Sequence, residues 1–144
     1  MELGGRVIVD GMNVLGSRPD GWWRDRPAAM ERLARRLDRL AESAGIELTV
    51  VYDGREHERV RAAVEHVGLR FAPGGPNAAD REIVRMIRSD PDPASIVAVS
   101  SDRRLRAAVK AAGATGIGAG ELLRALAEWE SAPEAGDPGG QAPS

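Results

Sequence analysis

The hydrophobic positions of this chain form short apolar runs separated by longer stretches in which apolar residues recur at helical spacing. Short runs rich in Val and Ile are typical of buried strands, and recurrence every third or fourth residue is typical of amphipathic helices. The predicted strands are residues 6–10, 47–53, 69–72, 95–100 and 115–118. The predicted helices are residues 27–44, 60–67, 77–90 and 102–112, followed by a last helix with Leu122, Leu123, Leu126 and Trp129 facing inward.

The ends of these elements carry their own signals. Pro27 suits the first turn of a helix, and Gly45 suits the position just after its last residue. Residues 11–26 contain several Gly, Pro and Asp residues, and Pro73-Gly74-Gly75-Pro76 repeats the same signal. Both segments are therefore predicted to be loops.

Strands that alternate with helices predict βαβ units with right-handed crossovers. The expected fold class is α/β, a three-layer α/β/α open parallel sheet of about five strands. It would occupy one domain over residues 1–130, and the Pro/Gly/Ala-rich residues 131–144 are expected to form a disordered tail. In such sheets binding sites form beyond the carboxyl ends of the strands.

The composition narrows the class of protein. The chain has 144 residues and 42% hydrophobic residues, enough for one packed domain. Cysteine is absent, which excludes disulfides, thiolate metal sites and a cysteine nucleophile. The first residues do not resemble a signal peptide, and no apolar stretch approaches the roughly 20 residues of a membrane span. We therefore expect a cytoplasmic protein without a membrane partner.

The basic residues of the chain are almost all arginines. The net charge is -2, and Lys110 is the only lysine among 20 basic residues. Arginine binds phosphate well. A coding bias toward arginine explains the same composition, so both interpretations stay open.

Four aspartates are predicted to meet at one edge of the sheet. Asp10 and Asp53 end the first two strands, Asp102 follows the fourth, and Asp80 lies in the first turn of the helix after the third. Carboxylates brought close together raise one another's pKa unless a cation compensates them. Oxygen ligands without a nearby His or Cys favour Mg²⁺ or Mn²⁺ over Zn²⁺.

Most of these acids also fit a local structural role. Asp102, like Ser101, fits a helix cap, and Asp80 fits a first-turn acid that interacts with the helix dipole. Asp53 precedes Gly54 and fits a turn. Asp10, which ends VIVD, has no such role, and the co-location of all four favours the metal site.

The segments VIVDGMNVLG, VVYDG, NAADREIVRMI and AVSSDRRL resemble, in this order, the NYN/YacP-like branch of the PIN-domain superfamily. The resemblance implies a metal-dependent endoribonuclease with strand order 3-2-1-4-5. Asp10, Asp80 and Asp102 match its catalytic, metal-binding carboxylates, and Asp53 is similar in place to an auxiliary metal-binding acid.

The resemblance assigns further roles to neighbouring residues. Asn13 matches an Asn that orients a ligand or substrate during catalysis, and Ser101 matches a small hydroxyl residue beside the last Asp. One departure is Asn77, where many relatives carry a Glu. Fewer carboxylates are thus available for one or two metal ions.

The chemistry that the resemblance implies is phosphodiester hydrolysis that leaves a 5′-phosphate and a 3′-hydroxyl. The partner would be RNA, whether mRNA on the ribosome, tRNA or rRNA. His57 and His66 are predicted on one surface helix, so a histidine-driven nuclease is disfavoured.

Substrate contacts are expected in the loop after the first strand. Trp22, Trp23 and Arg24 suit base stacking and phosphate pairing, although the tryptophans equally suit packing of the loop onto the sheet. Arg81 and Arg103 lie near the acidic edge and are further candidates for phosphate contacts.

Other functions fit less well. A non-catalytic RNA-binding or ribosome-associated module on the same fold is the main alternative. A haloacid-dehalogenase-type site needs an acid where Met12 stands, and a receiver domain needs an acidic pair that does not precede Asp10. The segment DGMNVLGS also lacks the G-x-G-x-x-G of a dinucleotide-binding domain.

Overall fold

The computed structural model describes residues 3–132 and contains one five-stranded sheet with all neighbouring strands parallel. The strands are β1 (Arg6–Asp10), β2 (Glu47–Asp53), β3 (Gly68–Ala72), β4 (Ile96–Val99) and β5 (Thr115–Ile117). Their order is β3-β2-β1-β4-β5, so the predicted fold class and strand order are confirmed. The central strand β1 carries Asp10 at its carboxyl end.

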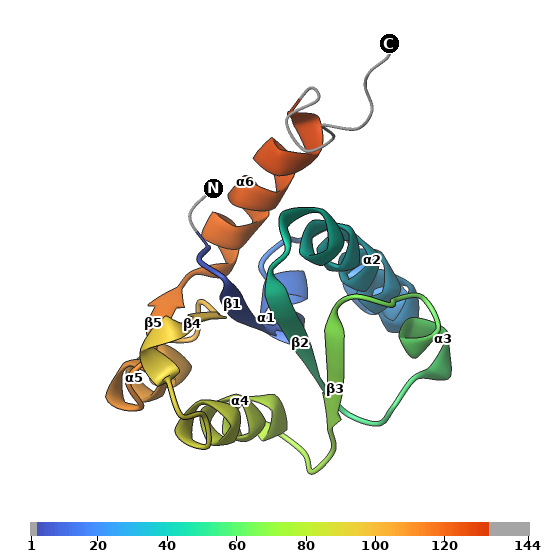
Figure 1. The fold of residues 1–144 in the computed structure, drawn as a ribbon. Helices are drawn as coiled ribbons and strands as arrows, with labels where there is room; N and C mark the ends of the chain where they lie inside the picture. The colour runs from blue at the N-terminus through green and yellow to red at the C-terminus, as the bar shows by residue number, and fades with distance from the viewer. Residues whose placement is uncertain (1–2, 133–144) are drawn as a thin grey trace.

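Helices cover both faces of the sheet (Figure 1). They are α1 (Gly11–Gly16), α2 (Arg26–Ala44), α3 (Glu58–Arg61), α4 (Ala78–Arg88), α5 (Arg103–Ala111) and α6 (Ala119–Ser131), with short 3-10 helices η1 (Trp22–Arg24) and η2 (Pro93–Ser95). Helices α4 and α5 pack on one face, and the buried residues of α1, α2, α3 and α6 belong to the core on the other. Within residues 3–132, no helix is both long and apolar enough to span a membrane.

The two cores follow from strand alternation. Val7 and Val9 of β1 point into the core beneath α2 and α6, whereas Ile8 points into the core beneath α4 and α5. Both cores consist mainly of Ala, Leu, Ile and Val, as the low aromatic content requires. A notable exception is Tyr52, which is fully buried and donates a hydrogen bond from its hydroxyl to the main-chain oxygen of Met30 at 2.8 Å.

The prediction of an unbroken loop over residues 11–26 is wrong. Its first six residues form α1 and residues 22–24 form η1. Val14 of α1 is buried and Leu15 packs against the same core. One apolar turn is too short to show helical periodicity in sequence, so only packing distinguishes it from a loop.

The predicted helix over residues 60–67 is shorter than expected. Helix α3 covers only Glu58–Arg61. The carboxylate of Asp38 on α2 accepts hydrogen bonds from the backbone N–H groups of Glu65, His66 and Val67, at 3.0, 2.6 and 2.8 Å. A side chain distant in sequence thus replaces the helical partners of this segment.

The last helix extends through Ser131, the first residue of the predicted tail. The rest of that tail, from residue 133 on, lies outside the described residues.

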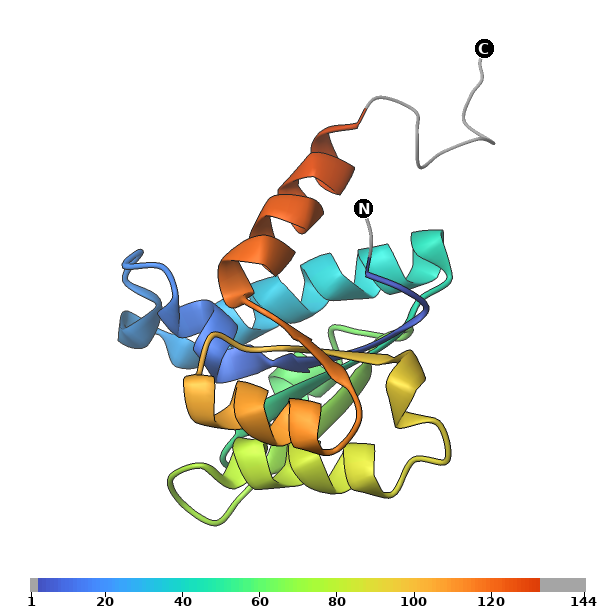
Figure 2. The ribbon, with the colours of Figure 1, turned by 90° about the vertical axis from the view of Figure 1, so that its left-hand side faces the viewer.

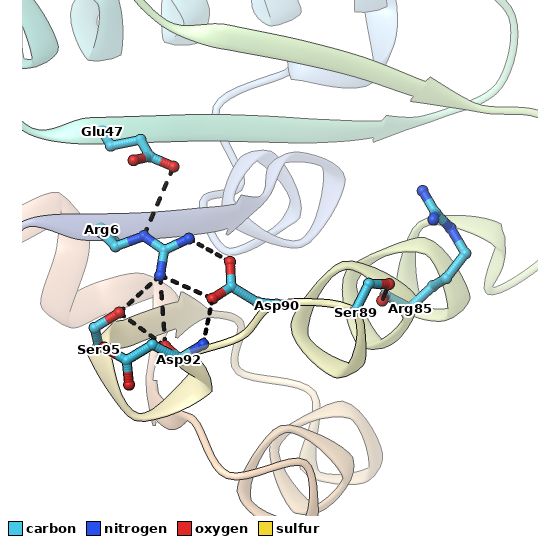
Figure 3. Close-up of polar contacts among 7 residues, drawn as sticks. All are labelled: Arg6, Glu47, Arg85, Ser89, Asp90, Asp92 and Ser95. Atoms are coloured by element: carbon cyan, nitrogen blue, oxygen red, sulfur yellow. Dashed lines mark hydrogen bonds and ion pairs between the residues drawn. The ribbon is translucent and has the colours of Figure 1, made fainter.

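A polar network joins β1 to the connection between α4 and β4 at the amino-terminal edge of the sheet (Figure 3). The Arg6 guanidinium donates a hydrogen bond to each carboxylate oxygen of Asp90, and to the Ser95 hydroxyl at 2.7 Å. It also lies 3.7 Å from a carboxylate oxygen of Glu47 on β2. This network holds β1, β2 and the segment before β4 together at the amino-terminal edge, which is the edge remote from the four aspartates.

Acid is expected to weaken this network. The Arg6 hydrogen bonds and a backbone N–H hydrogen bond from Asp92 lower the pKa of Asp90 from 3.8 to about 2. Because the folded-state pKa is depressed, the stabilisation is present above about pH 4 and is lost as pH falls toward 2. We expect Asp90→Asn to unfold at lower urea than the wild type at pH 7, and to lose less stability in acid.

The matched control is Asp92→Asn, because Asp92 is hydrogen-bonded to Arg6 only through its main-chain oxygen, at 3.4 Å, and its charge acts on Arg6 less than those of Asp90 and Glu47. The free energy of unfolding of Asp92→Asn should depend on pH as that of the wild type does. Parallel stability curves for the wild type and Asp90→Asn between pH 7 and 2 would contradict the prediction.

Candidate metal centre

The carboxyl edge of the sheet gathers the predicted acids because of strand register. Asp10 lies opposite Val51 of β2, and Val9 lies opposite Val99 of β4. Asp10 therefore lies beside the residue that follows β4. The amino-terminal ends of α4 and α5 reach the same edge, as does η1 (Figure 2).

Asp10 is buried at the centre of this edge, with 4% of its surface exposed. Its Oδ2 accepts a hydrogen bond from the Ser100 hydroxyl at 3.0 Å. Burial is the main reason why the pKa of Asp10 is raised from 3.8 to about 6; the negative charges of Asp80 and Asp53 act in the same direction, and the Ser100 hydrogen bond and the Asn13 backbone N–H act against them. A buried carboxylate that faces other carboxylates is a site that favours a cation.

Ser100 connects Asp10 to Asp102. Its hydroxyl donates to Asp10 and accepts from the Asp102 backbone N–H at 3.1 Å, and only 2% of the residue is exposed. The sequence analysis selected Ser101 and missed Ser100. The available signal was a polar residue directly after a buried strand, because buried polar groups require hydrogen-bond partners.

Asp102 is the N-cap of α5. Its Oδ1 accepts hydrogen bonds from the backbone N–H groups of Arg104 at 2.8 Å and Leu105 at 3.2 Å. The capping role considered from the sequence is thus present. Both bonds use the same oxygen, so the geometry leaves Oδ2 for another ligand.

Asp80 lies in the first turn of α4 and is half-buried. Burial raises its pKa, as do the charges of Asp102 and Asp53, whereas Arg104 and Arg81 act in the opposite direction. Asp80 therefore interacts electrostatically with the other three acids, and the structure brings all four predicted carboxylates to one edge.

Asp53 positions the start of α4. Its Oδ1 accepts a hydrogen bond from the Ala79 backbone N–H at 2.9 Å, which satisfies one free donor at the helix N-terminus. This contact places Asp80, the next residue of α4, against the carboxyl edge. Asp53 thus has a supporting role that the sequence analysis did not anticipate.

The backbone conformation of residue 77 explains why Asn suits this position, where many relatives carry a Glu. Asn77 precedes α4 with φ of 65°, and it is the only non-glycine residue with positive φ within residues 3–132. Asn tolerates this left-handed conformation better than most residues. An Asn here favours the turn that leads into α4.

Asn13 and Ser101 hold the surrounding segments together. The Asn13 side-chain oxygen accepts a hydrogen bond from the Ser101 backbone N–H at 2.8 Å. The Ser101 hydroxyl accepts one from the Ala119 backbone N–H at 2.9 Å, at the start of α6. These bonds join α1, the segment after β4 and α6 around the acids.

The two tryptophans of η1 lie in different environments. Their rings are in edge contact, with centroids 6.2 Å apart, and Trp23 is 52% exposed whereas Trp22 is half-buried. The Arg24 guanidinium lies 5.8 Å from the Trp23 ring centre. Trp22 lines a groove with Val14 and fits the packing role, whereas Trp23 is available for stacking.

The two predicted arginines also differ. The Arg81 guanidinium donates to the main-chain oxygens of Gly74 at 3.3 Å and Pro76 at 3.2 Å, so it holds the loop before α4. Arg103 is exposed and lines a groove with Ser101. Contacts of Arg24, Arg81 and Arg103 with a substrate stay predictions.

The acids fit a hard divalent cation in chemistry and charge. They supply oxygen ligands only, and among the described residues 3–132 the buried Asp10 has no cationic hydrogen-bond partner. In the part of the chain that the structure describes, no three acidic or histidine side chains are arranged closely enough to enclose one ion. Mg²⁺ commonly binds one or two carboxylates and completes its shell with water and phosphate oxygens, so an ion bound here would need water ligands.

Two substitutions of Asp53 should separate its charge from its hydrogen bond. Asp53→Ala leaves the Ala79 N–H without its acceptor and is expected to lower stability by about 1 kcal/mol. Asp53→Asn keeps an acceptor oxygen and should unfold close to the wild type in urea. Equal destabilisation by both variants would show that the Ala79 contact does not hold α4.

Comparison with known proteins agrees with this geometry. The family model of the YacP-like NYN domain matches residues 7–136. The fold is similar to crystal structures of Rae1 (YacP) from Bacillus subtilis. A tryptophan-to-leucine mutant has a TM-score of 0.71 and 25% identity, over 87% of this chain and 76% of that one. A second Rae1 structure has a TM-score of 0.67 and 22% identity, over 86% and 74%. No curated protein matches this chain.

Proposed function

The chain belongs to the YacP-like NYN domain family, a nuclease-type branch of the PIN-like superfamily, and on this premise we propose that it is a Mg²⁺- or Mn²⁺-dependent endoribonuclease. The observation that carries the proposal is the buried Asp10 carboxylate, which faces the charges of Asp80 and Asp53 at the carboxyl edge. Such an arrangement is expected where a protein binds a divalent cation next to a phosphodiester.

The four acids would have different roles in binding the ion. Asp10 and Asp80 would hold the ion directly, whereas Asp102, through the oxygen that its capping bonds do not use, would reach it by way of a coordinated water. Asp53 holds α4 and adds negative charge, and its role as a direct metal ligand stays a prediction. When bound, the ion would lower the pKa of a coordinated water and offset charge on the phosphoryl oxygens.

Other groups keep these ligands in position. Ser100 orients the Asp10 carboxylate and holds the Asp102 backbone. Asn13 fixes the segment after β4. Hydrolysis at this centre should leave a 5′-phosphate and a 3′-hydroxyl. The identity of the RNA, whether mRNA on the ribosome, tRNA or rRNA, and its cytoplasmic location stay predictions.

The test is RNA cleavage by the purified chain with Mg²⁺, Mn²⁺ or EDTA, on single-stranded and structured RNA. Cleavage should require a metal and should fall on the order of 100-fold in Asp80→Asn, because a carboxylate that binds the ion is lost. Cleavage that persists in EDTA, or that Asp80→Asn leaves unchanged, would exclude this function.

A non-catalytic RNA-binding module is the second candidate. Two observations favour it: no three acids within residues 3–132 enclose an ion, and Asn77 stands where a further Glu is expected. This candidate predicts that the chain binds RNA but does not cleave it when Mg²⁺ or Mn²⁺ is added. It also predicts that Asp80→Asn leaves RNA binding unchanged.

A further inference from the structure

We propose that the groove between α4 and α5 binds the sugar–phosphate backbone of single-stranded RNA that extends from the acidic edge. This inference rests on the proposed function in one respect, namely that the substrate is RNA. It adds a binding path and residues that the catalytic proposal does not require.

The groove lies along two neighbouring helices. Helices α4 and α5 run side by side in both views of the fold (Figures 1 and 2). The groove between them has a volume of about 690 Å³, and its lining extends from Asn77 and Asp80 to Ser89. Because Asp80 belongs to the acidic edge and also lines the groove, the two are continuous.

The charge of the groove is strongly positive. Arg81, Arg85 and Arg88 of α4 line it at helical spacing, and Arg104 of α5 lines it from the other side. Asp80 is the only acidic residue in this lining. A positively charged groove that starts at an acidic centre suits a polyanion held in place by phosphate contacts.

Not all of these arginines are equally available. Arg85 donates two hydrogen bonds to Glu82, and Arg81 holds the loop before α4. Arg88 is exposed and makes no ion pair within residues 3–132. It lies about 12 Å along the helix from Asp80 at 1.5 Å per residue, so it marks the end of the groove that is remote from the acidic edge.

The groove also contains apolar surface, contributed by the partly exposed Val84 of α4 and Ala108 of α5. Unpaired bases can lie against such side chains and against guanidinium planes, whereas bases in a duplex are turned inward. The lining therefore favours single-stranded RNA over double-stranded RNA.

A second basic groove lies on the opposite side of α5, beside β5, and provides a matched control. Arg103, Arg106 and Lys110 line it, and the Arg106 guanidinium is bonded to the main-chain oxygen of Gly116 at 2.9 Å. None of the four acids lines this groove. Lys110 lies near the far end of α5, as Arg88 lies at the far end of α4.

The experiment is fluorescence anisotropy of a labelled single-stranded RNA of about 12 nucleotides, titrated with the full chain in EDTA at several salt concentrations. We expect Arg88→Gln to weaken binding about fivefold at low salt and to reduce the slope of log affinity against log salt by about 0.7, because one phosphate contact is lost. Lys110→Gln should bind within about twofold of the wild type.

Each outcome decides the proposal. Equal affinity of the wild type and Arg88→Gln, or an equal loss in Lys110→Gln, would overturn the groove assignment. Tighter binding of a duplex of the same sequence would overturn the preference for single strands. Arg88-dependent binding without metal-dependent cleavage would retain the groove and remove the nuclease function, so the two proposals fail separately.

Discussion

Asp10→Asn is expected to remove most of the RNA cleavage while making the metal-free protein more stable than the wild type. The pKa of Asp10 is raised from 3.8 to about 6 in the folded state, mainly by burial. Above pH 6 the Asp10 carboxylate is therefore charged in both states, but the charge is buried in the folded protein and solvated in the unfolded chain. The wild type should gain stability as pH falls from 7 toward 4, because the folded state binds this proton first.

The size of both effects follows from this shift. Asn keeps an oxygen that can accept the Ser100 hydrogen bond and removes the charge, so Asp10→Asn should be about 2 to 3 kcal/mol more stable at pH 8. Its cleavage rate should fall on the order of 100-fold or more, because a buried charged ligand is lost.

Thermal unfolding with and without Mg²⁺ provides the measurement. The ion should raise the Tm of the wild type by mass action and should raise that of Asp10→Asn much less. In urea unfolding at pH 5 and 8, the difference in free energy of unfolding between the variant and the wild type should be smaller at pH 5. A variant that is less stable than the wild type at pH 8, or an equal response to Mg²⁺, would contradict the assignment of Asp10.

Gly11→Ala is expected to destabilise the fold by about 3 kcal/mol, because the site leaves no room for a methyl group. A Cβ at Gly11 would lie 2.4 Å from Cε1 of Tyr52 and 3.0 Å from Cγ2 of Val50. Tyr52 is fully buried and bonded to Met30, so it has little freedom to move. The substitution must instead displace α1, which directly follows Asp10.

The matched control is Gly16→Ala at the other end of α1, where the nearest side-chain atom to the new Cβ is 3.8 Å away. This variant should be as stable as the wild type or slightly more stable, since alanine favours helix formation. Guanidinium unfolding of both variants tests the claim, and similar midpoints for the two would contradict it. Gly11→Ala should also impair cleavage, because α1 carries Asn13.

The fold class and the location of the acids could be predicted from the amino-acid sequence. Alternation of apolar runs with helical periodicity required a parallel sheet, and in a parallel sheet the carboxyl ends of the strands meet at one edge. Asp10 and Asp53 end strands and Asp102 follows one, so their meeting needed no knowledge of packing. The strand order came from the family motifs, which the register of β1 with β2 and β4 bears out.

The hydrogen-bond partner of each polar group at that edge could be identified only in the folded chain. Ser100 joins Asp10 to Asp102, and Asp53 serves the Ala79 N–H, because buried polar atoms must find partners that are distant in sequence. In the same way, the periodicity of residues 60–67 predicted a helix, but the Asp38 carboxylate binds the backbone N–H groups of residues 65–67 and the helix ends earlier. Local pattern determines which face a residue lies on, whereas burial and long-range hydrogen bonds determine its partner, and only the folded chain brings those partners together.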